Sequence, residues 1–182
     1  QGIFLLLVYT LLLSLPYLAL REFQGEEGRR VIIAAHMIET GDWVVPSVEG
    51  TPYLKKPPFF NWALAAFFTL SGQISEYTAR LVSIAAAFLC ALSLSFLWFK
   101  ISEVKDLWFI LPGLIFLTFS EVLGKSIKAE IDMTFTLFVT LSFVSWFYFY
   151  EVRQKPGLGW GVSCFFLGIS FLTKGVQAPF FF

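Results

Sequence analysis

The feature that most constrains this chain is a series of long apolar runs bounded by charged residues. The first run, Gly2–Leu20, is 19 residues long and carries no charged side chain. A helix of about 20 apolar residues crosses the hydrocarbon core of a bilayer. Four further runs have a similar character: Leu81–Phe99, Leu107–Gly124, Met133–Tyr150 and Pro156–Thr173. The pattern predicts an all-α polytopic membrane protein with about five transmembrane helices.

The composition supports this class and argues against several others. Hydrophobic residues make up 57% of the chain and charged residues 14%, whereas soluble domains carry about 25% charged residues. The net charge is zero, so there is no electrostatic basis for binding nucleic acid. Cys90 and Cys164 both lie in apolar runs, and His36 is the single histidine. These counts argue against a disulfide framework, a zinc site and a multi-histidine metal cluster.

The two ends of the sequence suggest a piece of something longer. The first residue is Gln1 rather than Met, and the last residues stop inside an apolar run. We therefore expect residues 1–182 to be the N-terminal part of a longer protein. The first run lacks a basic leader and a small-residue cleavage site, so we expect a membrane helix rather than a cleaved signal peptide.

One polar stretch of 38 residues, Gly25–Trp62, interrupts the apolar pattern. Its first part, Glu26–Thr40, is predicted to form an amphipathic helix that lies along the membrane surface and ends at Gly41. The apolar face is expected to hold Val31, Ala35 and Ile38, with Ile32 beside them. The other faces are expected to hold Arg29, Arg30, His36 and Glu39.

The apolar run Phe59–Leu70 decides the topology. It is only 12 residues long, and runs of 10–14 residues are more often interfacial or re-entrant than spanning. If it does not span, the polar stretch, the Lys125–Asp132 link and Lys174 all lie on one side of the membrane, where their charges can converge. That side would hold nine Lys and Arg against four on the other, and the usual charge bias would place it in the cytoplasm. A phosphate-binding site on that side would break this bias for a functional reason.

Two adjacent carboxylates, Glu26 and Glu27, open the predicted surface helix. They are candidates for a general base or a metal-holding acid. The alternative is that they only complement the dipole at the N-terminus of the helix.

A lysine pair, Lys55 and Lys56, stands before Pro57 and Pro58. One reading is a phosphate-binding lysine on a backbone fixed by proline, and the other is an anchor that snorkels to the lipid headgroups. Asp132 begins a later span and is a candidate second carboxylate, or else a solvated loop charge.

The order of motifs resembles a known class of membrane enzymes. A first span and an acidic pair precede M-x-x-x-G-D-W-x-x-P, then G-x-x-Y-x-x-K-P-P, and a helix that begins A-R-L. This order is similar to the membrane glycosyltransferases of the GT-C class, and more narrowly to the protein O-mannosyltransferase and lipid A aminoarabinose transferase group. The matching residues are Met37, Gly41, Asp42, Trp43, Pro46, Gly50, Tyr53, Lys56, Pro57, Ala79, Arg80 and Leu81.

The resemblance implies an activity and a location. Such enzymes move a sugar from a polyprenyl-phosphate donor to a lipid, glycan or protein acceptor at the extracytoplasmic face of the membrane, here the bacterial inner membrane. Residues 1–182 would be the N-terminal part of the transmembrane domain, with 21–80 as its first extracytoplasmic loop. Membrane lipids would surround these helices. The motifs do not specify a cofactor, and they leave open whether a divalent cation takes part.

The resemblance also implies roles for individual residues. Glu26 matches the catalytic acid of the first loop, which is more usually Asp, and Glu27 follows it. Asp132 matches a second acid near the start of a later span. Lys56 matches the lysine implied to contact the donor phosphate, with Arg80 or Lys174 as further phosphate-binding candidates.

A second class stays in view. In a transporter, acidic residues line a permeation path, and ionisable side chains are expected near the middle of spans. The middles of the five predicted spans lack such residues, which favours the enzyme.

Overall fold

The computed structural model describes residues 1–18, 22–48, 50–102 and 106–181. The predicted end of the first span at Leu20 and the first residue of the 21–80 loop lie outside the described residues. The longer helices are α1 (Gly2–Leu18), α2 (Glu27–Thr40), α3 (Phe59–Ser71), α4 (Glu76–Ile101), α7 (Ile131–Phe147) and α8 (Pro156–Lys174). The short elements are strands β1 (Ser47–Val48) and β2 (Thr51–Pro52), helices α5 (Leu111–Thr118) and α6 (Ser120–Ser126), and turns η1 (Leu107–Ile110), η2 (Tyr148–Val152) and η3 (Ala178–Phe181).

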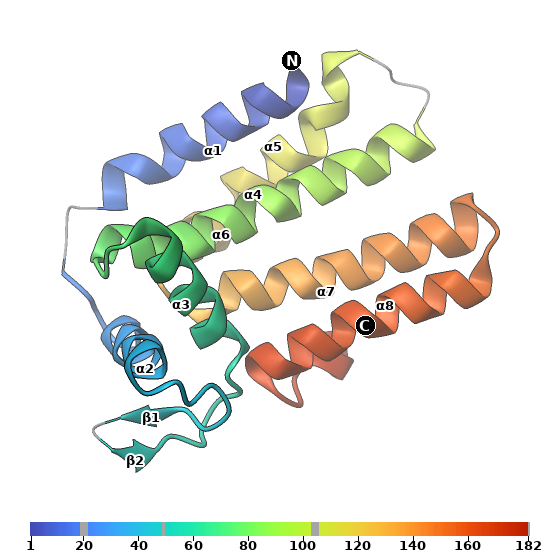
Figure 1. The fold of residues 1–182 in the computed structure, drawn as a ribbon. Coiled ribbons are helices and arrows are strands. Elements are labelled where there is room, and N and C mark those ends of the chain that lie inside the picture. Colours follow the sequence, from blue (N-terminus) through green and yellow to red (C-terminus); the bar gives the residue numbers. More distant parts are fainter. Residues whose placement is uncertain (19–21, 49, 103–105, 182) are drawn as a thin grey trace.

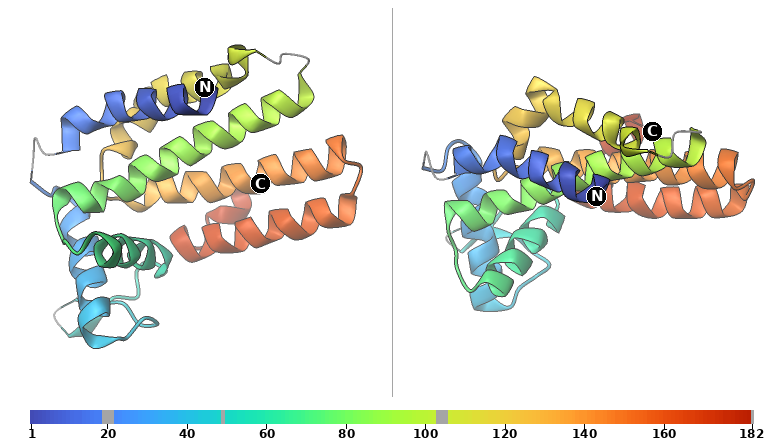
Figure 2. Two further views of the ribbon diagram at one scale, coloured as in Figure 1. Left: turned by 45° about the horizontal axis from the view of Figure 1, so that its top comes forward. Right: turned by 90° about the horizontal axis from the view of Figure 1, so that it is seen from above.

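Four helices form a layer in the order α1, α4, α7, α8, as Figure 1 shows. The pair α5 and α6 packs against α4 on one side of this layer (Figure 2). The polar stretch forms α2, the antiparallel hairpin of β1 and β2, and α3, which project from one end of the layer. The predicted all-α membrane class is confirmed.

The five predicted spans are all helical, but they are not equivalent. Within the described residues, three helical segments are long and apolar enough to cross a membrane: Glu76–Ile101, Ile131–Val152 and Pro156–Lys174. The segment predicted as Leu107–Gly124 is broken, because the axes of η1–α5 and α6 meet at 76°. Phe119, at the break, has extended backbone angles (φ −63°, ψ 131°). The first helix, α1, has 17 residues and is shorter than the other candidates.

Helix α4 lies between α1 and α7 and also contacts α3, α5 and α6. Its sequence explains where it begins and how closely its neighbours pack. Ser75 caps its first turn by accepting a hydrogen bond from the amide of Thr78, whose hydroxyl bonds back to the Ser75 amide. Small residues on α4 then permit close approach of a neighbour. A side chain on Gly113 of α5 would meet the carbonyl oxygen of Ala91 at 2.6 Å, so glycine is needed where the two helices touch.

Helix α2 begins one residue later than predicted, with Glu26 as its N-cap, and it buries a face that the prediction did not assign. Ile32 is 51% exposed and Ile38 37% exposed. Helix α2 packs on α3 through a different face, whose buried residues are Glu27, Arg30, Val31, Ile33, Ala34 and Met37. This buried face includes two charged side chains, Glu27 and Arg30, whose burial the sequence pattern did not predict.

Helix α3 has 13 residues, too short to cross a membrane upright, as expected for the Phe59–Leu70 run. Its buried side chains Phe60, Leu64 and Phe68 join one hydrophobic cluster with residues of α2, α4 and the α6–α7 link. This cluster ties the polar stretch to the ends of the membrane helices. The backbone leaves α3 through Gly72, at φ +66°.

Candidate functional site

The two adjacent carboxylates of α2 have opposite surroundings. Glu27 is fully buried, whereas the Glu26 side chain is 48% exposed. Successive residues of a helix point about 100° apart. When α2 packs on α3 and α4, one carboxylate therefore enters the protein and the other stays at its surface.

Glu27 forms a buried ion pair with Arg80 of α4. Arg80 Nε lies 3.0 Å from Glu27 Oε1, and Arg80 Nη2 lies 3.3 Å from Oε2. The amide of Ala129 also donates to Oε1, at 2.8 Å, and the amide of Gln24 donates to Oε2, at 3.0 Å. Burial would raise the pKa of the Glu27 carboxyl, but these four hydrogen bonds outweigh it and hold that pKa below its ordinary value.

Arg80 is also fully buried, and it donates to backbone carbonyl oxygens as well. Its Nη1 donates to the carbonyl oxygen of Leu18, and its Nη2 donates to that of Glu22 at 3.2 Å. The Glu27–Arg80 pair thus joins the end of α1, the start of α2, the start of α4 and the α6–α7 link.

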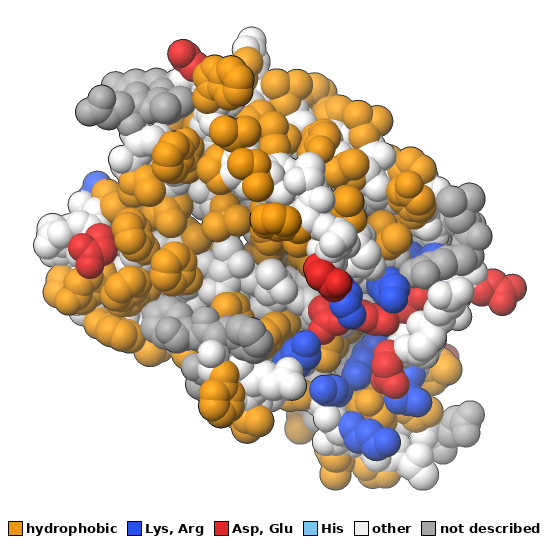
Figure 3. All heavy atoms as spheres, turned by 180° about the vertical axis from the view of Figure 1, so that it is seen from behind, with side chains coloured by type: hydrophobic (Ala, Val, Ile, Leu, Met, Phe, Trp, Pro, Cys, Tyr) orange, Lys and Arg blue, Asp and Glu red, His pale blue; other side chains and the backbone are white. Residues whose placement is uncertain are grey.

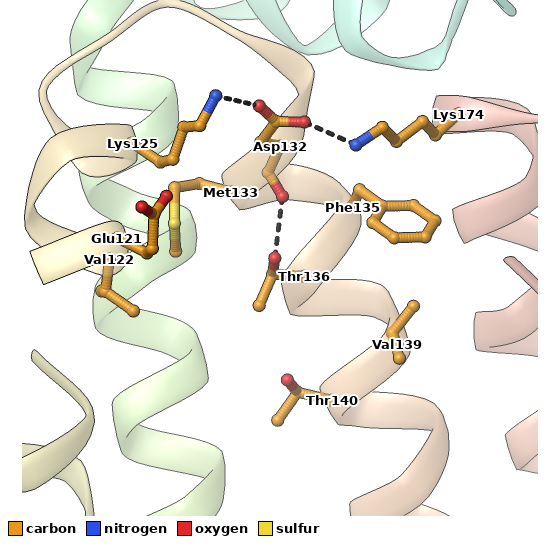
Figure 4. Close-up of a pocket in the computed structure, with 10 residues that line it drawn as sticks. All are labelled: Glu121, Val122, Lys125, Asp132, Met133, Phe135, Thr136, Val139, Thr140 and Lys174. Atoms are coloured by element: carbon orange, nitrogen blue, oxygen red, sulfur yellow. Dashed lines mark hydrogen bonds and ion pairs between the residues drawn. The ribbon is translucent and has the colours of Figure 1, made fainter. Parts of the chain in front are cut away.

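Asp132, in the first turn of α7, is held by two lysines from different helices (Figure 4). Its Oδ2 lies 2.6 Å from Lys125 Nζ of α6, and its Oδ1 lies 2.7 Å from Lys174 Nζ at the end of α8. Lys125 also lies 3.3 Å from Glu130, and Lys174 lies over the ring of Phe135. These side chains stay partly exposed, with 25% of Asp132 and 35% of Lys125 open to solvent.

Two neighbouring hollows meet at Asp132 and Lys174. The first, called here the cationic hollow, has a volume of about 350 Å³. Its lining residues are Glu26, Arg29, Arg30, Tyr53, Lys55, Lys56, Glu130, Ile131, Asp132 and Lys174. Five of them are basic and three acidic, an excess of two positive charges. Figure 3 shows most of the charged side chains on this face gathered at one end, beside a largely hydrophobic remainder.

The second hollow, called here the α7 hollow, has a volume of about 520 Å³ and follows α7 away from Asp132 (Figure 4). Its lining residues are Glu121, Val122, Lys125, Asp132, Met133, Phe135, Thr136, Val139, Thr140 and Lys174. The charged lysines and acids stand toward one end of it, and the rest is lined by apolar side chains together with the hydroxyl side chains of Thr136 and Thr140. Such a hollow suits a ligand with an anionic head and an apolar tail.

The structure brings most of the predicted site residues together. Four of the six candidate residues, Glu26, Lys56, Asp132 and Lys174, line the cationic hollow. The other two, Glu27 and Arg80, are buried against each other and do not belong to the lining of either hollow.

Sequence reasoning missed the two arginines of α2 and Tyr53. The guanidinium groups of Arg29 and Arg30 lie over the ring of Tyr53, 5.6 Å and 5.4 Å from its centroid. Arg29 Nη1 lies 2.6 Å from Glu26 Oε1. The signal was available, because residues three and four positions after Glu26 fall on the same side of a helix.

A divalent cation does not fit this donor set. Both carboxylate oxygens of Asp132 accept from ammonium groups, and basic side chains outnumber acidic ones around the cationic hollow. Among the described residues, no three His, Cys, Asp or Glu side chains form a group that could hold a metal ion.

Comparison with known proteins identifies the family. The sequence profile of the family described as dolichyl-phosphate-mannose-protein mannosyltransferase matches residues 55–182. This chain belongs to that family. The resemblance read from its motifs is therefore confirmed, and membership favours an enzyme over a transporter.

Relatives cover the first loop as well. A protein of Aeromonas salmonicida named undecaprenyl phosphate-alpha-4-amino-4-deoxy-L-arabinose arabinosyl transferase is 33% identical, over 97% of this chain and 31% of its own length. A protein of the same name from Pseudomonas aeruginosa (strain LESB58) is 31% identical, over 84% of this chain and 28% of its own length. The chain thus spans about a third of the length of these family members.

Two solved structures share the fold. Both are of ArnT from Cupriavidus metallidurans, one in the apo state and one bound to undecaprenyl phosphate. The TM-scores are 0.81 and 0.82, at 24% and 23% identity, over 96% of this chain in each case. The matched region makes up 33% and 32% of the two ArnT chains. The ArnT structures therefore extend well beyond the region that this chain matches.

Proposed function

We propose that this chain is the part of a membrane glycosyltransferase that binds a polyprenyl-phosphate-linked sugar and carries its catalytic carboxylate. The sugar passes to a lipid, glycan or protein acceptor at the extracytoplasmic face of the bacterial inner membrane. The observation that carries this proposal is the cationic hollow, which gathers Glu26, Lys56, Asp132 and Lys174 at the end of the membrane helices. The names of the relatives make 4-amino-4-deoxy-L-arabinose the first sugar to test.

The donor fits the two hollows in one orientation. Its phosphate belongs near Lys56 and Lys174, because cations stabilise the negative charge that grows on the departing phosphate. Its prenyl chain belongs in the α7 hollow, where Val122, Phe135 and Val139 provide an apolar wall. Lys174 and Asp132 line both hollows and mark where head and tail meet.

Glu26 is the carboxylate placed to act as the general base. It lines the cationic hollow and is half exposed, so an acceptor can reach it. It takes the proton from the acceptor nucleophile, which forms a bond to the anomeric carbon. The bond from that carbon to the phosphate oxygen breaks, and its electron pair leaves with the polyprenyl phosphate.

Glu27 and Arg80 receive a positioning role in this proposal. Their atoms are buried and committed to each other and to the backbone. The pair fixes the start of α2 next to Glu26 and the link that leads into Asp132.

The test of this proposal is sugar transfer by the full-length protein in lipid nanodiscs, with an undecaprenyl-phosphate-linked sugar as donor. Lys56→Ala is expected to lose transfer by about 10-fold or more, the effect of removing one charged hydrogen bond. The matched control is Lys128→Ala, since Lys128 is not among the described residues that line either hollow. Wild-type transfer by Lys56→Ala would reduce that lysine to a membrane anchor.

A further inference from the structure

Arg30 is a buried cation in the wall of the cationic hollow that the proposed reaction does not use. Only 3% of the residue is exposed. Its nearest carboxylate oxygen, Glu26 Oε2, lies 3.6 Å from its Nη2, and the Tyr53 hydroxyl lies 3.5 Å from the same atom. Glu26 is bound more closely by Arg29, at 2.6 Å. The charge of Arg30 is therefore only loosely compensated.

One arm of this guanidinium has no hydrogen-bond partner. Nη1 of Arg30 is shielded from solvent and makes no hydrogen bond within the described part of the chain. A buried donor without a partner carries a desolvation cost that a bound acceptor would remove. Arg80, the other buried arginine described above, contrasts with it, because that guanidinium bonds to a carboxylate and two carbonyl oxygens.

The surroundings hold this guanidinium in place for a ligand. It lies over the ring of Tyr53, 5.4 Å from the centroid, and that ring also supports Arg29. A planar guanidinium can present two parallel N–H groups to a phosphate or carboxylate. The excess of two positive charges around the hollow attracts such a group.

We propose that Arg30, supported by Tyr53, is a binding residue for an anionic oxygen group, a phosphate or a carboxylate, on a substrate that enters the cationic hollow. This inference rests on the proposed function for the identity of the substrates. The anion comes either from the donor phosphate or from a charged group on the acceptor. An anion on Arg30 also replaces Glu26 as its partner, so that Glu26 keeps its closer contact with Arg29 alone.

The test measures binding rather than transfer, so that it is independent of the reaction. The full-length protein in nanodiscs is titrated with undecaprenyl phosphate and, separately, with inorganic phosphate, and the rise in Tm gives each Kd. Arg30→Gln removes the charge and Arg30→Lys retains it without the planar fork. Arg153→Gln is the matched control, because Arg153 is exposed and lies beyond the opposite end of α7.

Wild type and Arg153→Gln are expected to bind alike. Arg30→Gln should weaken at least one probe by about 10-fold, the effect of a hydrogen bond to a charged group. If Arg30→Gln binds undecaprenyl phosphate more weakly than wild type, the anion belongs to the donor. If only the binding of inorganic phosphate is weaker, the anion belongs to the acceptor. Should Arg30→Gln not accumulate, Arg30→Lys carries the test, with several-fold weaker binding expected.

Equal affinities of wild type and the Arg30 variants for both probes overturn the inference. So does a wild-type protein that binds neither probe. Failure of the proposed function has a different signature: both probes bind in an Arg30-dependent way, but no sugar is transferred.

Discussion

Two acids with basic partners, Glu27 and Asp132, differ in their burial and in the type of cation that binds them. Glu27 and its partner Arg80 are both fully buried. Asp132 and its partners Lys125 and Lys174 are each 25–35% exposed and line hollows. The distances are similar, 3.0 Å in the first case and 2.6–2.7 Å in the second. Distance alone therefore does not distinguish a fully buried ion pair from one that lines a hollow.

Burial and the type of cation make the distinction. Arginine presents fixed, planar donors that suit a permanent buried pair, whereas lysine carries a compact charge on a flexible stem. Lys125 and Lys174 can leave Asp132 for an incoming phosphate without exposing an unpaired charge in the protein interior. Arg80 has no such freedom, because its neighbours are the buried carboxylate and backbone carbonyl groups.

The largest expected effect is on the buried pair. Glu27→Ala leaves Arg80 buried without its carboxylate, and removing one member of a buried pair costs about 3–5 kcal/mol. The Tm of the full-length protein in nanodiscs should fall accordingly. Glu26→Ala is the matched control, because Glu26 is half exposed, its close pair with Arg29 contributes about 1 kcal/mol or less, and its contact with the buried Arg30 is long, at 3.6 Å. Equal Tm values for the two variants would remove the distinction between the pairs.

The partly exposed cluster of Asp132, Lys125 and Lys174 should show a small effect on stability and a larger effect on sugar transfer. Asp132→Asn is expected to change the free energy of unfolding by about 1 kcal/mol or less, since its partners remain solvated. Undecaprenyl phosphate should bind as tightly as before or more tightly, because a negative charge next to the phosphate site is gone. Sugar transfer should fall at the same time. Weaker binding of undecaprenyl phosphate would place its phosphate away from Asp132.

A smaller effect is expected from pH. The folded protein holds the pKa of Glu27 below its ordinary value, so this carboxylate stabilises the fold above the unfolded pKa of about 4.3. That stabilisation is lost as the pH falls through the folded pKa. Between pH 7 and pH 3 the Tm of the wild type should fall more than that of Glu27→Gln. Parallel curves would mean that Glu27 does not titrate with folding.

The general architecture could be predicted from local patterns. Apolar runs predicted the long helices, Gly41 predicted the end of α2, and the length of Phe59–Leu70 predicted a helix too short to cross a membrane upright. The convergence of Glu26, Lys56, Asp132 and Lys174 followed from topology, because charges on one side of a membrane share one surface.

The buried side of α2 could not be predicted in this way. Charged residues are expected to face outward, and Glu27 is buried only because Arg80 and the amide of Ala129 satisfy it. These partners lie 53 and 102 residues away in the sequence, beyond any local pattern. The break at Phe119 also could not be predicted, because neither Pro nor Gly stands at the bend.

The most direct test of the account compares the two neighbouring carboxylates as amides. Sugar transfer from an undecaprenyl-phosphate-linked donor is measured for Glu26→Gln and Glu27→Gln, per folded molecule, beside the Tm of each. Glu26→Gln should lose about 10²–10⁴-fold in turnover at unchanged Tm, the range of general base catalysis. Glu27→Gln should lower the Tm and keep most of its turnover per folded molecule. A Glu26→Gln protein as active as wild type, beside a folded but inactive Glu27→Gln, would contradict the account.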